Sequence, residues 1–224
     1  MKDTMHPIFI TGIGTGIGKT LVAAVVTEAL EAAYWKPVQS GYEEGTDSEW
    51  VGERINHPKG RLYPEAYKLS LPASPHIAAR QEGVVIDLNL IVRQFKAIKA
   101  RPLVIEGAGG LFVPLNDRQF MIDLIRKLDA TVILVSRNYL GSINHSLLTA
   151  AACRRQGLRV AGWIFNDQYM TYEQEIAQWS GLPAIASIPF EDDLSRDFVR
   201  EQAARIRPAL QTALKARSLN LPYL

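Results

Sequence analysis

Short runs of apolar residues alternate along most of the chain with longer segments in which apolar residues recur every three or four positions. The first pattern is typical of buried strands, and the second of helices with one buried face. Strands are predicted at residues 8–10, 34–38, 103–106, 131–135, 160–165 and 184–188. Helices are predicted at residues 19–31, 47–55, 88–98, 119–128, 142–156, 172–180 and 195–216. This order predicts an α/β fold: a mostly parallel, doubly wound sheet in a single domain over residues 1–224.

Two stretches depart from this alternation. Residues 57–75 carry four prolines and little periodicity, which favours a functional loop. Residues 107–110 contain three glycines directly after a predicted strand, which indicates a sharp turn. Because ligands bind at the carboxyl ends of the strands in folds of this class, the residues that follow each strand are the candidates for a functional site.

The first strand end carries the strongest motif. A glycine-rich turn, residues 12–18, leads from the strand into Lys19 and Thr20 at the start of a helix. Backbone N–H groups of such a turn and the positive end of the helix dipole converge on an anion. Lys19 would reach the β- and γ-phosphates of a nucleotide, and the Thr20 hydroxyl would ligate Mg²⁺. This P-loop is one residue longer than the strict motif, because Ile13 stands where the first glycine is expected and Gly12 precedes it. A turn that merely joins strand to helix is the alternative, which the three glycines and the Lys-Thr pair disfavour.

Charged and polar side chains follow other predicted strands. Glu106 ends a buried strand, where a carboxylate has to be paired or bind a metal, so it is either a Mg²⁺ ligand or half of a structural ion pair. Asp47 is either a second carboxylate ligand or a plain helix N-cap. Lys36 either stabilises a developing anion in a water-poor site or is an exposed lysine at a strand end. Ser40 is a weaker candidate of the same region.

Two later segments also place polar groups at strand ends. Residues 140–145 begin a helix, opened by Ser142 or Asn144, whose free N–H groups would bind a substrate carboxylate. His145 taken alone is more typical of a capping or packed histidine. The side-chain amide of Asn166 would read a purine base, with an Asx-turn as the alternative.

Composition and charge narrow the classes of partner. A net charge of +2 over 224 residues gives no reason to expect a nucleic-acid groove or a membrane patch. Cys153 is the single cysteine, which excludes an internal disulfide and a thiolate metal cluster. We find neither a signal-peptide pattern nor an apolar run of membrane-spanning length, and we therefore expect a cytoplasmic protein.

Taken in order, six segments match the motifs of dethiobiotin synthetases, and the chain resembles this family from Ile8 to about Pro189. The segments are residues 12–20, 36–41 (Lys-Pro-Val-Gln-Ser-Gly), 74–77 (Ser-Pro-His-Ile), 106–110 (Glu-Gly-Ala-Gly-Gly), 140–145 (Leu-Gly-Ser-Ile-Asn-His) and 162–167 (Gly-Trp-Ile-Phe-Asn-Asp). The resemblance implies a homodimeric ligase of biotin biosynthesis. It would convert 7,8-diaminopelargonate, CO₂ and MgATP into dethiobiotin, ADP and phosphate, through a carbamate and a carbamic–phosphoric mixed anhydride.

The resemblance also implies roles for single residues. Lys19 and Lys36 would stabilise phosphate and carbamate oxygens, and Thr15 would be the third catalytic residue. Mg²⁺ would be held by Thr20, Asp47 and Glu106. The nucleotide would be bound by Gly14, Thr15, Gly16, Ile17, Gly18, Lys19, Thr20, Asn166, Pro189, Phe190 and Glu191. The substrate would be bound by Lys36, Ser40, Gly109, Gly141, Ser142, Ile143, Asn144 and His145, with the helix start contributed by the partner subunit.

Two other readings of the P-loop remain. Related amidoligases of cobalamin synthesis usually append a glutaminase domain with a catalytic cysteine, whereas the single Cys153 lies in an apolar helical segment. Partitioning or regulatory ATPases usually carry a signature lysine at the position of Gly14. Both observations favour the dethiobiotin synthetase interpretation.

Overall fold

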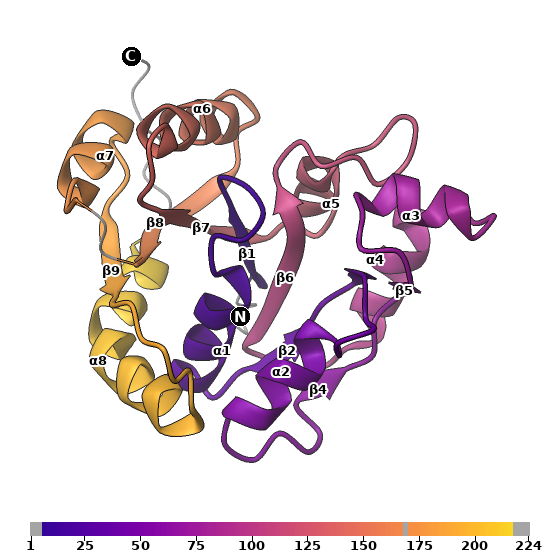
Figure 1. Ribbon diagram of the computed structural model, residues 1–224, viewed down its shortest axis with the longest axis horizontal. Coiled ribbons are helices and arrows are strands. Elements are labelled where there is room, and N and C mark those ends of the chain that lie inside the picture. The colour runs from indigo at the N-terminus through magenta and orange to yellow at the C-terminus, as the bar shows by residue number, and fades with distance from the viewer. Residues whose placement is uncertain (1–5, 168–169, 217–224) are drawn as a thin grey trace, which may run out of the picture.

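The computed structural model describes residues 6–167 and 170–216, and the fold is an α/β sheet with helices on both sides (Figure 1). The strands are β1 (Ile8–Gly12), β2 (Ala33–Trp35), β3 (Val38–Ser40), β4 (Leu62–Tyr63), β5 (Tyr67–Leu69), β6 (Leu103–Gly110), β7 (Thr131–Arg137), β8 (Arg159–Asn166) and β9 (Ala184–Ile188). The helices are α1 (Lys19–Ala29), α2 (Asp47–Arg54), α3 (Pro75–Gln81), α4 (Leu88–Ala97), α5 (Met121–Lys127), α6 (Ser142–Arg155), α7 (Glu173–Ser180) and α8 (Arg196–Lys215).

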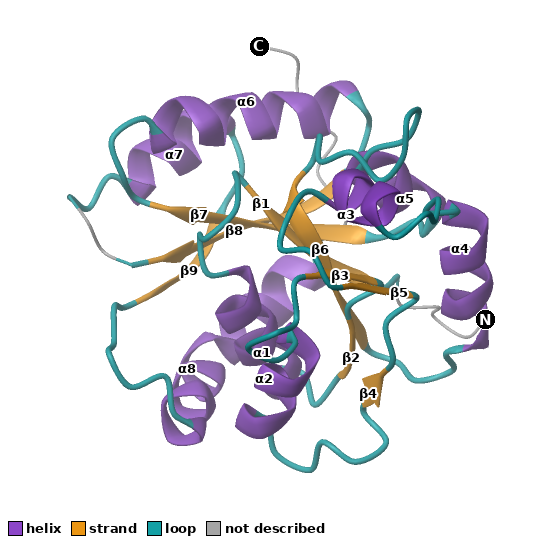
Figure 2. Ribbon diagram, turned by 45° about the vertical axis from the view of Figure 1, so that its right-hand side comes forward, coloured by secondary structure: helices purple, strands orange, loops and turns teal. Residues whose placement is uncertain are grey.

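The main sheet has seven strands in the order β4-β2-β6-β1-β7-β8-β9, and every pairing between them is parallel. Helices α1, α2 and α8 cover one face, whereas α3 to α7 pack on the other (Figure 2). Strand β1 lies in the middle and is buried along its whole length. The predicted doubly wound parallel sheet is confirmed, and the P-loop emerges from its central strand.

Alternation along β1 shows how the sequence divides the core in two. Ile8 and Ile10 point into the cluster beneath α1 and α8, and Phe9 points into the cluster on the opposite face. Successive side chains of a strand point to opposite faces, so an uninterrupted apolar run is what a strand covered on both sides requires. The same rule assigns alternate residues of β6 to the two faces of the sheet.

The predicted strand at residues 34–38 is wrong in its extent. Strand β2 ends at Trp35, and β3 starts at Val38 in a separate two-stranded sheet with β5. Pro37 separates them, because proline lacks the N–H that a continuing ladder needs. Its carbonyl oxygen instead accepts hydrogen bonds from the backbone of Ala66 and Tyr67 at 2.9 and 3.0 Å. Lys36 lies in this break, outside both strands, and its ammonium contacts the carboxylates of Asp47 and Glu106.

Residues 57–75 and 107–110 also differ from the prediction. The first stretch contains the short strands β4 and β5, so it is only partly a loop. The second continues β6 to Gly110 instead of turning sharply. A Cβ atom on Gly107 would lie 2.7 Å from the ring of Phe9, and one on Gly110 would lie 3.1 Å from the Gly12 carbonyl oxygen. These glycines therefore allow β1 and β6 to approach closely, which is the reason for their presence in a strand.

Candidate active site

The P-loop connects β1 to α1, and the Lys19 side chain reaches back across this loop. Gly18 is the N-cap of α1 and has a left-handed backbone with φ 85°, which favours glycine. The Lys19 ammonium donates a hydrogen bond to the Gly14 carbonyl oxygen at 2.6 Å. Burial lowers the pKa of Lys19 to about 8, and the nearby Lys36 lowers it as well, while the carboxylates of Glu106 and Asp47 raise it. The ammonium is thus held across the loop, within reach of an anion that the loop would cradle.

Next to the loop, charged groups from three elements meet. Lys36 follows β2, Asp47 begins α2, and Glu106 lies within β6. The Lys36 ammonium contacts Glu106 Oε1 at 2.9 Å and also pairs with Asp47 Oδ2. Lys36 is 5% exposed and Glu106 is 1% exposed. Burial opposes the charge on Lys36, but the two carboxylates outweigh it and raise the pKa of the lysine. Lys36 is therefore a buried cation, and the interpretation as an exposed strand-end lysine is wrong.

The Thr20 hydroxyl completes this cluster. It lies 3.1 Å from Asp47 Oδ1 and 2.9 Å from Glu106 Oε1. A hydroxyl has one proton, so it donates to one of these carboxylates at a time. Three oxygen-bearing side chains that are far apart in the sequence therefore face one point beside the P-loop. We call Thr20, Lys36, Asp47 and Glu106 the charge cluster.

Asp47 is free for this position because another residue caps α2. Thr46 is the N-cap: its hydroxyl accepts the backbone N–H of Glu49 at 3.1 Å, and the Glu49 carboxylate accepts that of Thr46 at 2.7 Å. This is a reciprocal capping box. The alternative of Asp47 as a plain N-cap is wrong. The backbone N–H of Asp47 also donates to Gln39 Oε1 at 3.3 Å, which ties the start of α2 to β3.

Tyr34 belongs to the site although the sequence did not point to it. Its hydroxyl donates to Glu106 Oε2 at 2.7 Å, and the side chain is fully buried on β2. Burial, followed by the charge of Glu106, raises the pKa of Tyr34 well above its ordinary value, so the phenol keeps its proton. One local signal pointed to Tyr34: it lies on β2, two residues before the candidate Lys36. Its contact with Glu106, however, depends on the pairing of β2 with β6, which is not a local feature of the sequence.

Three further candidates, Ser40, Thr15 and Gly109, lie at or near the ends of β3, β1 and β6. The Ser40 hydroxyl on β3 is buried and has no hydrogen-bond partner among the described residues. A Cβ atom on Gly109, which has φ 60°, would lie 3.5 Å from the Thr15 hydroxyl. The structure thus brings Thr15 and Gly109 together, as the predicted site requires. An unpaired buried hydroxyl is costly, and a ligand oxygen or nitrogen would satisfy it.

Asn166 lies over the opposite side of the P-loop, at the end of β8. Its side-chain amide donates to the Ile17 carbonyl oxygen at 3.2 Å, and a Cβ atom on Gly18 would lie 1.9 Å from that amide nitrogen. Asn166 pairs in register with Ile188, so Pro189 follows on the neighbouring strand, and Phe190 is exposed. The alternative Asx-turn would involve residue 168, which lies outside the described residues. Of the nucleotide-binding residues predicted on this side, Asn166 therefore contacts the loop, and Pro189 directly follows its register partner Ile188.

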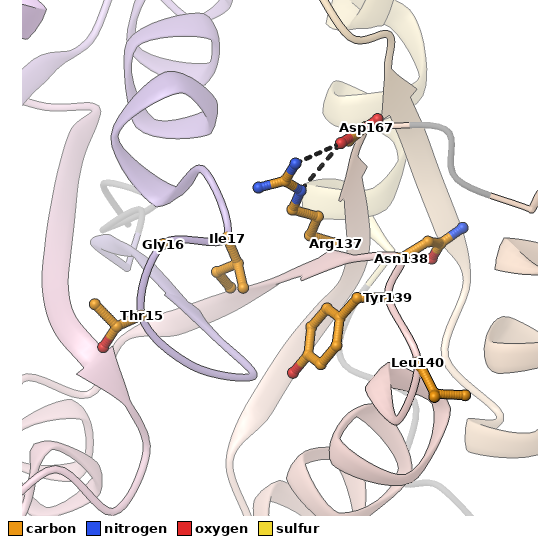
Figure 3. Close-up of a pocket in the computed structure, with 8 residues that line it drawn as sticks. All are labelled: Thr15, Gly16, Ile17, Arg137, Asn138, Tyr139, Leu140 and Asp167. Atoms are coloured by element: carbon orange, nitrogen blue, oxygen red, sulfur yellow. Dashed lines mark hydrogen bonds and ion pairs between the residues drawn. The ribbon is translucent and has the colours of Figure 1, made fainter.

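A cavity of about 480 Å³ opens between the P-loop and the ends of β7 and β8 (Figure 3). Its lining includes residues 15–17, residues 137–140 and Asp167. The Arg137 guanidinium pairs with Asp167 Oδ2 through two nitrogens at 3.0 and 2.8 Å. The sequence indicated Asp167, at the end of the 162–167 segment, but not Arg137, because their pairing depends on two strands being adjacent. The cavity lies between the P-loop and the segment of residues 137–140 that precedes α6.

The predicted substrate-binding segment forms that start. Helix α6 begins at Ser142, and the N-cap is Gly141, which has no side chain to satisfy the free N–H groups. The Ser142 hydroxyl accepts the N–H of Tyr139 at 3.2 Å, and Nδ1 of His145 lies 2.8 Å from the Tyr139 hydroxyl. His145 is thus packed locally. Among the described residues, no hydrogen bond or ion pair joins residues 141–145 to the charge cluster.

Comparison with known proteins identifies the family. A family model described as an AAA domain matches residues 6–197. An ATP-dependent dethiobiotin synthetase of Cytophaga hutchinsonii is 45% identical over 203 residues, which cover 90% of this chain and 97% of the relative. The corresponding protein of Christiangramia forsetii is 43% identical, with 90% and 96% covered. The chain belongs to the dethiobiotin synthetase family. It is an ATP-dependent enzyme with a P-loop, as the sequence predicted.

Two solved structures of other ATPase families share this fold. The MinC:MinD cell division protein complex of Aquifex aeolicus matches with a TM-score of 0.60 at 15% identity, over 97% of this chain and 99% of that one. A ParA family ATPase of Chlorobium tepidum matches with a TM-score of 0.55 at 15% identity, over 96% and 95%. At this identity the likeness concerns the fold alone. Within residues 6–167 and 170–216, no helix has the length and apolar character needed to span a membrane.

Proposed function

We propose that this enzyme converts 7,8-diaminopelargonate, CO₂ and MgATP into dethiobiotin, ADP and phosphate. The observation that carries the proposal is the charge cluster beside the P-loop, with Lys19 and Lys36 both buried next to Glu106. Two cations there would meet a phosphoryl group on one side and a carbamate on the other. Family membership at 45% identity to a dethiobiotin synthetase supports the same reaction.

The chemistry asks the protein for positioning and charge neutralisation. One substrate amine attacks CO₂, a C–N bond forms, and the nitrogen loses a proton to give a carbamate. A carbamate oxygen then accepts the γ-phosphoryl group as the bond to ADP breaks, and the second amine attacks the carbonyl carbon and expels phosphate. No step needs a covalent bond to the enzyme. Lys19 would hold the transferred phosphoryl oxygens and Lys36 the carbamate oxygens, so each neutralises charge that grows during transfer.

Thr20, Asp47 and Glu106 fit a magnesium ion. Mg²⁺ prefers hard oxygen ligands and commonly takes one or two carboxylates together with phosphate oxygens and waters. The described residues contain no group of three His, Cys, Asp or Glu side chains that would hold a metal alone. The Thr20 hydroxyl and the two carboxylates that each lie within 3.1 Å of it supply the protein's share of such a shell. Bound there, the ion would neutralise phosphate charge.

The remaining predicted residues would surround the substrates. Ser40 and Thr15 would position the carbamate, which gives the unpaired Ser40 hydroxyl a partner. Gly109 would leave room beside Thr15. The start of α6, residues 141–145, would receive the substrate carboxylate through the N–H groups of its first turn that have no backbone acceptor among the described residues, those of Ile143 and Asn144. Because they are not joined to the charge cluster within the described chain, a homodimer in which the partner subunit supplies them accounts for their role.

The nucleotide would extend from the P-loop towards β8 and β9. The loop N–H groups of residues 14–18, with Lys19 and Thr20, would bind the phosphates, and Asn166 would face the adenine base. Pro189, Phe190 and Glu191 would line the base, and an exposed Phe190 ring offers a surface on which it can pack.

Fixation of labelled bicarbonate into acid-stable product tests this function. Purified protein receives MgATP and 7,8-diaminononanoate (7,8-diaminopelargonate), and each component is omitted in turn. Label retained only in the complete mixture is the expected result. Hydrolysis of ATP that is indifferent to the diamine and is stimulated by a protein or DNA partner would instead support a switch ATPase, the alternative function of a P-loop protein.

A further inference from the structure

The two oxygens of Glu106 have different partners. Oε1 faces the charge cluster, where it accepts from the Lys36 ammonium at 2.9 Å and lies 2.9 Å from the Thr20 hydroxyl. Oε2 faces the core, where it accepts from the Tyr34 hydroxyl at 2.7 Å. The carboxylate is therefore held from both sides, and a neutral donor occupies the side away from the P-loop.

Strand register explains how Tyr34 reaches this oxygen. Tyr34 lies beside Val104 in the parallel pairing of β2 with β6, and both point into the core under α1. Glu106 is two residues beyond Val104 and so lies on the same face. Trp35 points to the other face, where its indole N–H donates to the Pro64 carbonyl oxygen at 2.9 Å. A tyrosine at position 34 thus reaches diagonally across to the carboxylate at the site.

We infer that Tyr34 is a positioning residue that presents Glu106 Oε1 to the nucleotide-bound cation and thereby sets how much Mg²⁺ strengthens nucleotide binding. This inference rests on the proposed function, since it needs Glu106 as a cation ligand. A fully buried carboxylate oxygen that loses its donor has no solvent to replace it. The carboxylate would then turn towards the remaining donors, and its alignment for the cation would be lost. Partners that orient a metal ligand commonly matter about ten- to a hundredfold in metal affinity.

The test is Tyr34→Phe, which removes the hydroxyl and keeps the ring. Calorimetric titration measures the dissociation constant of a β,γ-methylene ATP analogue, once with excess Mg²⁺ and once with EDTA. We expect the ratio of the two constants, the Mg²⁺ enhancement, to fall about tenfold in the variant. The affinity measured in EDTA should stay within about twofold of wild type, because Tyr34 does not touch the P-loop.

Tyr67→Phe is the matched control. Tyr67 on β5 also uses its hydroxyl in a hydrogen bond, which it accepts from the Asp87 backbone N–H at 2.8 Å. Loss of this hydrogen bond affects the start of α4, where Asp87 is the N-cap, and it involves no residue of the charge cluster. The Mg²⁺ enhancement should match wild type in this variant, whatever happens to its melting temperature.

Several outcomes overturn the inference. An unchanged Mg²⁺ enhancement in Tyr34→Phe does so, and so does an equal loss of affinity with and without Mg²⁺, which would indicate a merely structural role. If Tyr34→Phe does not fold, the comparison moves to Glu106→Gln alone, which keeps the Tyr34 hydroxyl and removes the carboxylate that it orients. The Mg²⁺ enhancement should then fall at least tenfold, and an enhancement equal to wild type overturns the inference. A wild-type protein without any Mg²⁺ enhancement overturns the cation site itself. If bicarbonate fixation fails while the Mg²⁺ enhancement behaves as expected, the proposed reaction is wrong and the inference about Tyr34 stands.

Discussion

Lys36 Nζ and Glu106 Oε1 lie 2.9 Å apart at the edge of the P-loop, and both side chains are almost completely buried. Such a pair is expensive to desolvate, and replacing buried pairs by apolar residues is often neutral or stabilising. The pair lies beside a phosphate-binding loop, and the proposed function gives both charges a role there. In the proposed reaction Lys36 would exchange its carboxylate partners for carbamate oxygens as substrate binds.

Replacement of this cation should stop the reaction. We expect Lys36→Gln to lower kcat by about a hundred- to a thousandfold, the usual effect of removing a preorganised donor to a developing anion. Unpaired carboxylates at Asp47 and Glu106 should also lower the unfolding free energy by about 3 kcal/mol. Steady-state kinetics measure the first effect and thermal unfolding the second.

Lys96→Gln is the control for this variant. Lys96 is exposed on α4, and no ion pair involves it among the described residues. It should retain wild-type turnover and stability. Turnover of Lys36→Gln close to that of Lys96→Gln, with the fold confirmed by circular dichroism, would remove Lys36 from the mechanism.

Ser40 offers a test in which stability and activity move apart. Its buried hydroxyl has no hydrogen-bond partner within residues 6–167 and 170–216, so Ser40→Ala should leave the melting temperature unchanged or slightly higher. If the hydroxyl binds the carbamate, kcat/KM for the diamine should fall about tenfold. Ser187→Ala on β9 removes another buried, unpartnered hydroxyl and should alter neither quantity. Parallel behaviour of the two variants in the kinetic assay would show that Ser40 does not contact the substrate.

Much of the fold was predictable because its signals are local. The apolar run of β1 and the glycine-rich turn into Lys19-Thr20 each lie within about a dozen residues. The capping box at Thr46 and Glu49 is equally local, and it identifies Asp47 as free to bind elsewhere. In contrast, the strand arrangement after Pro37 was not predicted, because β3 pairs with β5 in a separate sheet.

The contacts within the site were not predictable to the same extent. Glu106 meets Lys36 and Tyr34 across about seventy positions of sequence, and these contacts follow from β2 lying next to β6. Sequence periodicity gives the face of each strand but not its neighbour. The candidates Lys36 and Glu106 were therefore identified one by one, whereas the donor that orients Glu106 became visible only from strand register.

Cys153 should be inert in the folded protein. It lies inside α6 and faces the core, and burial raises the pKa of its thiol to about 12. Only the thiolate reacts with disulfide reagents, and at pH 8 almost none forms at that pKa. We expect no reaction with dithionitrobenzoate under native conditions and one equivalent of thiol after unfolding in guanidinium. Rapid labelling of the native protein would contradict this expectation and would show that α6 opens enough to expose the thiol.

A side chain at Gly18 should weaken nucleotide binding, in addition to the stability cost of any side chain in a left-handed backbone. Gly18 and Gly60 both have a left-handed backbone, with φ 85° and 78°, so alanine at either position should cost about 1 kcal/mol of stability. A Cβ atom on Gly60 meets open space, whereas one on Gly18 would lie 1.9 Å from Asn166 Nδ2 and displace that amide from the Ile17 carbonyl oxygen. Calorimetric titration with ATP should therefore show about tenfold weaker binding for Gly18→Ala and wild-type binding for Gly60→Ala. Equal affinities in the two variants would mean that contact between Asn166 and the P-loop does not shape the nucleotide site.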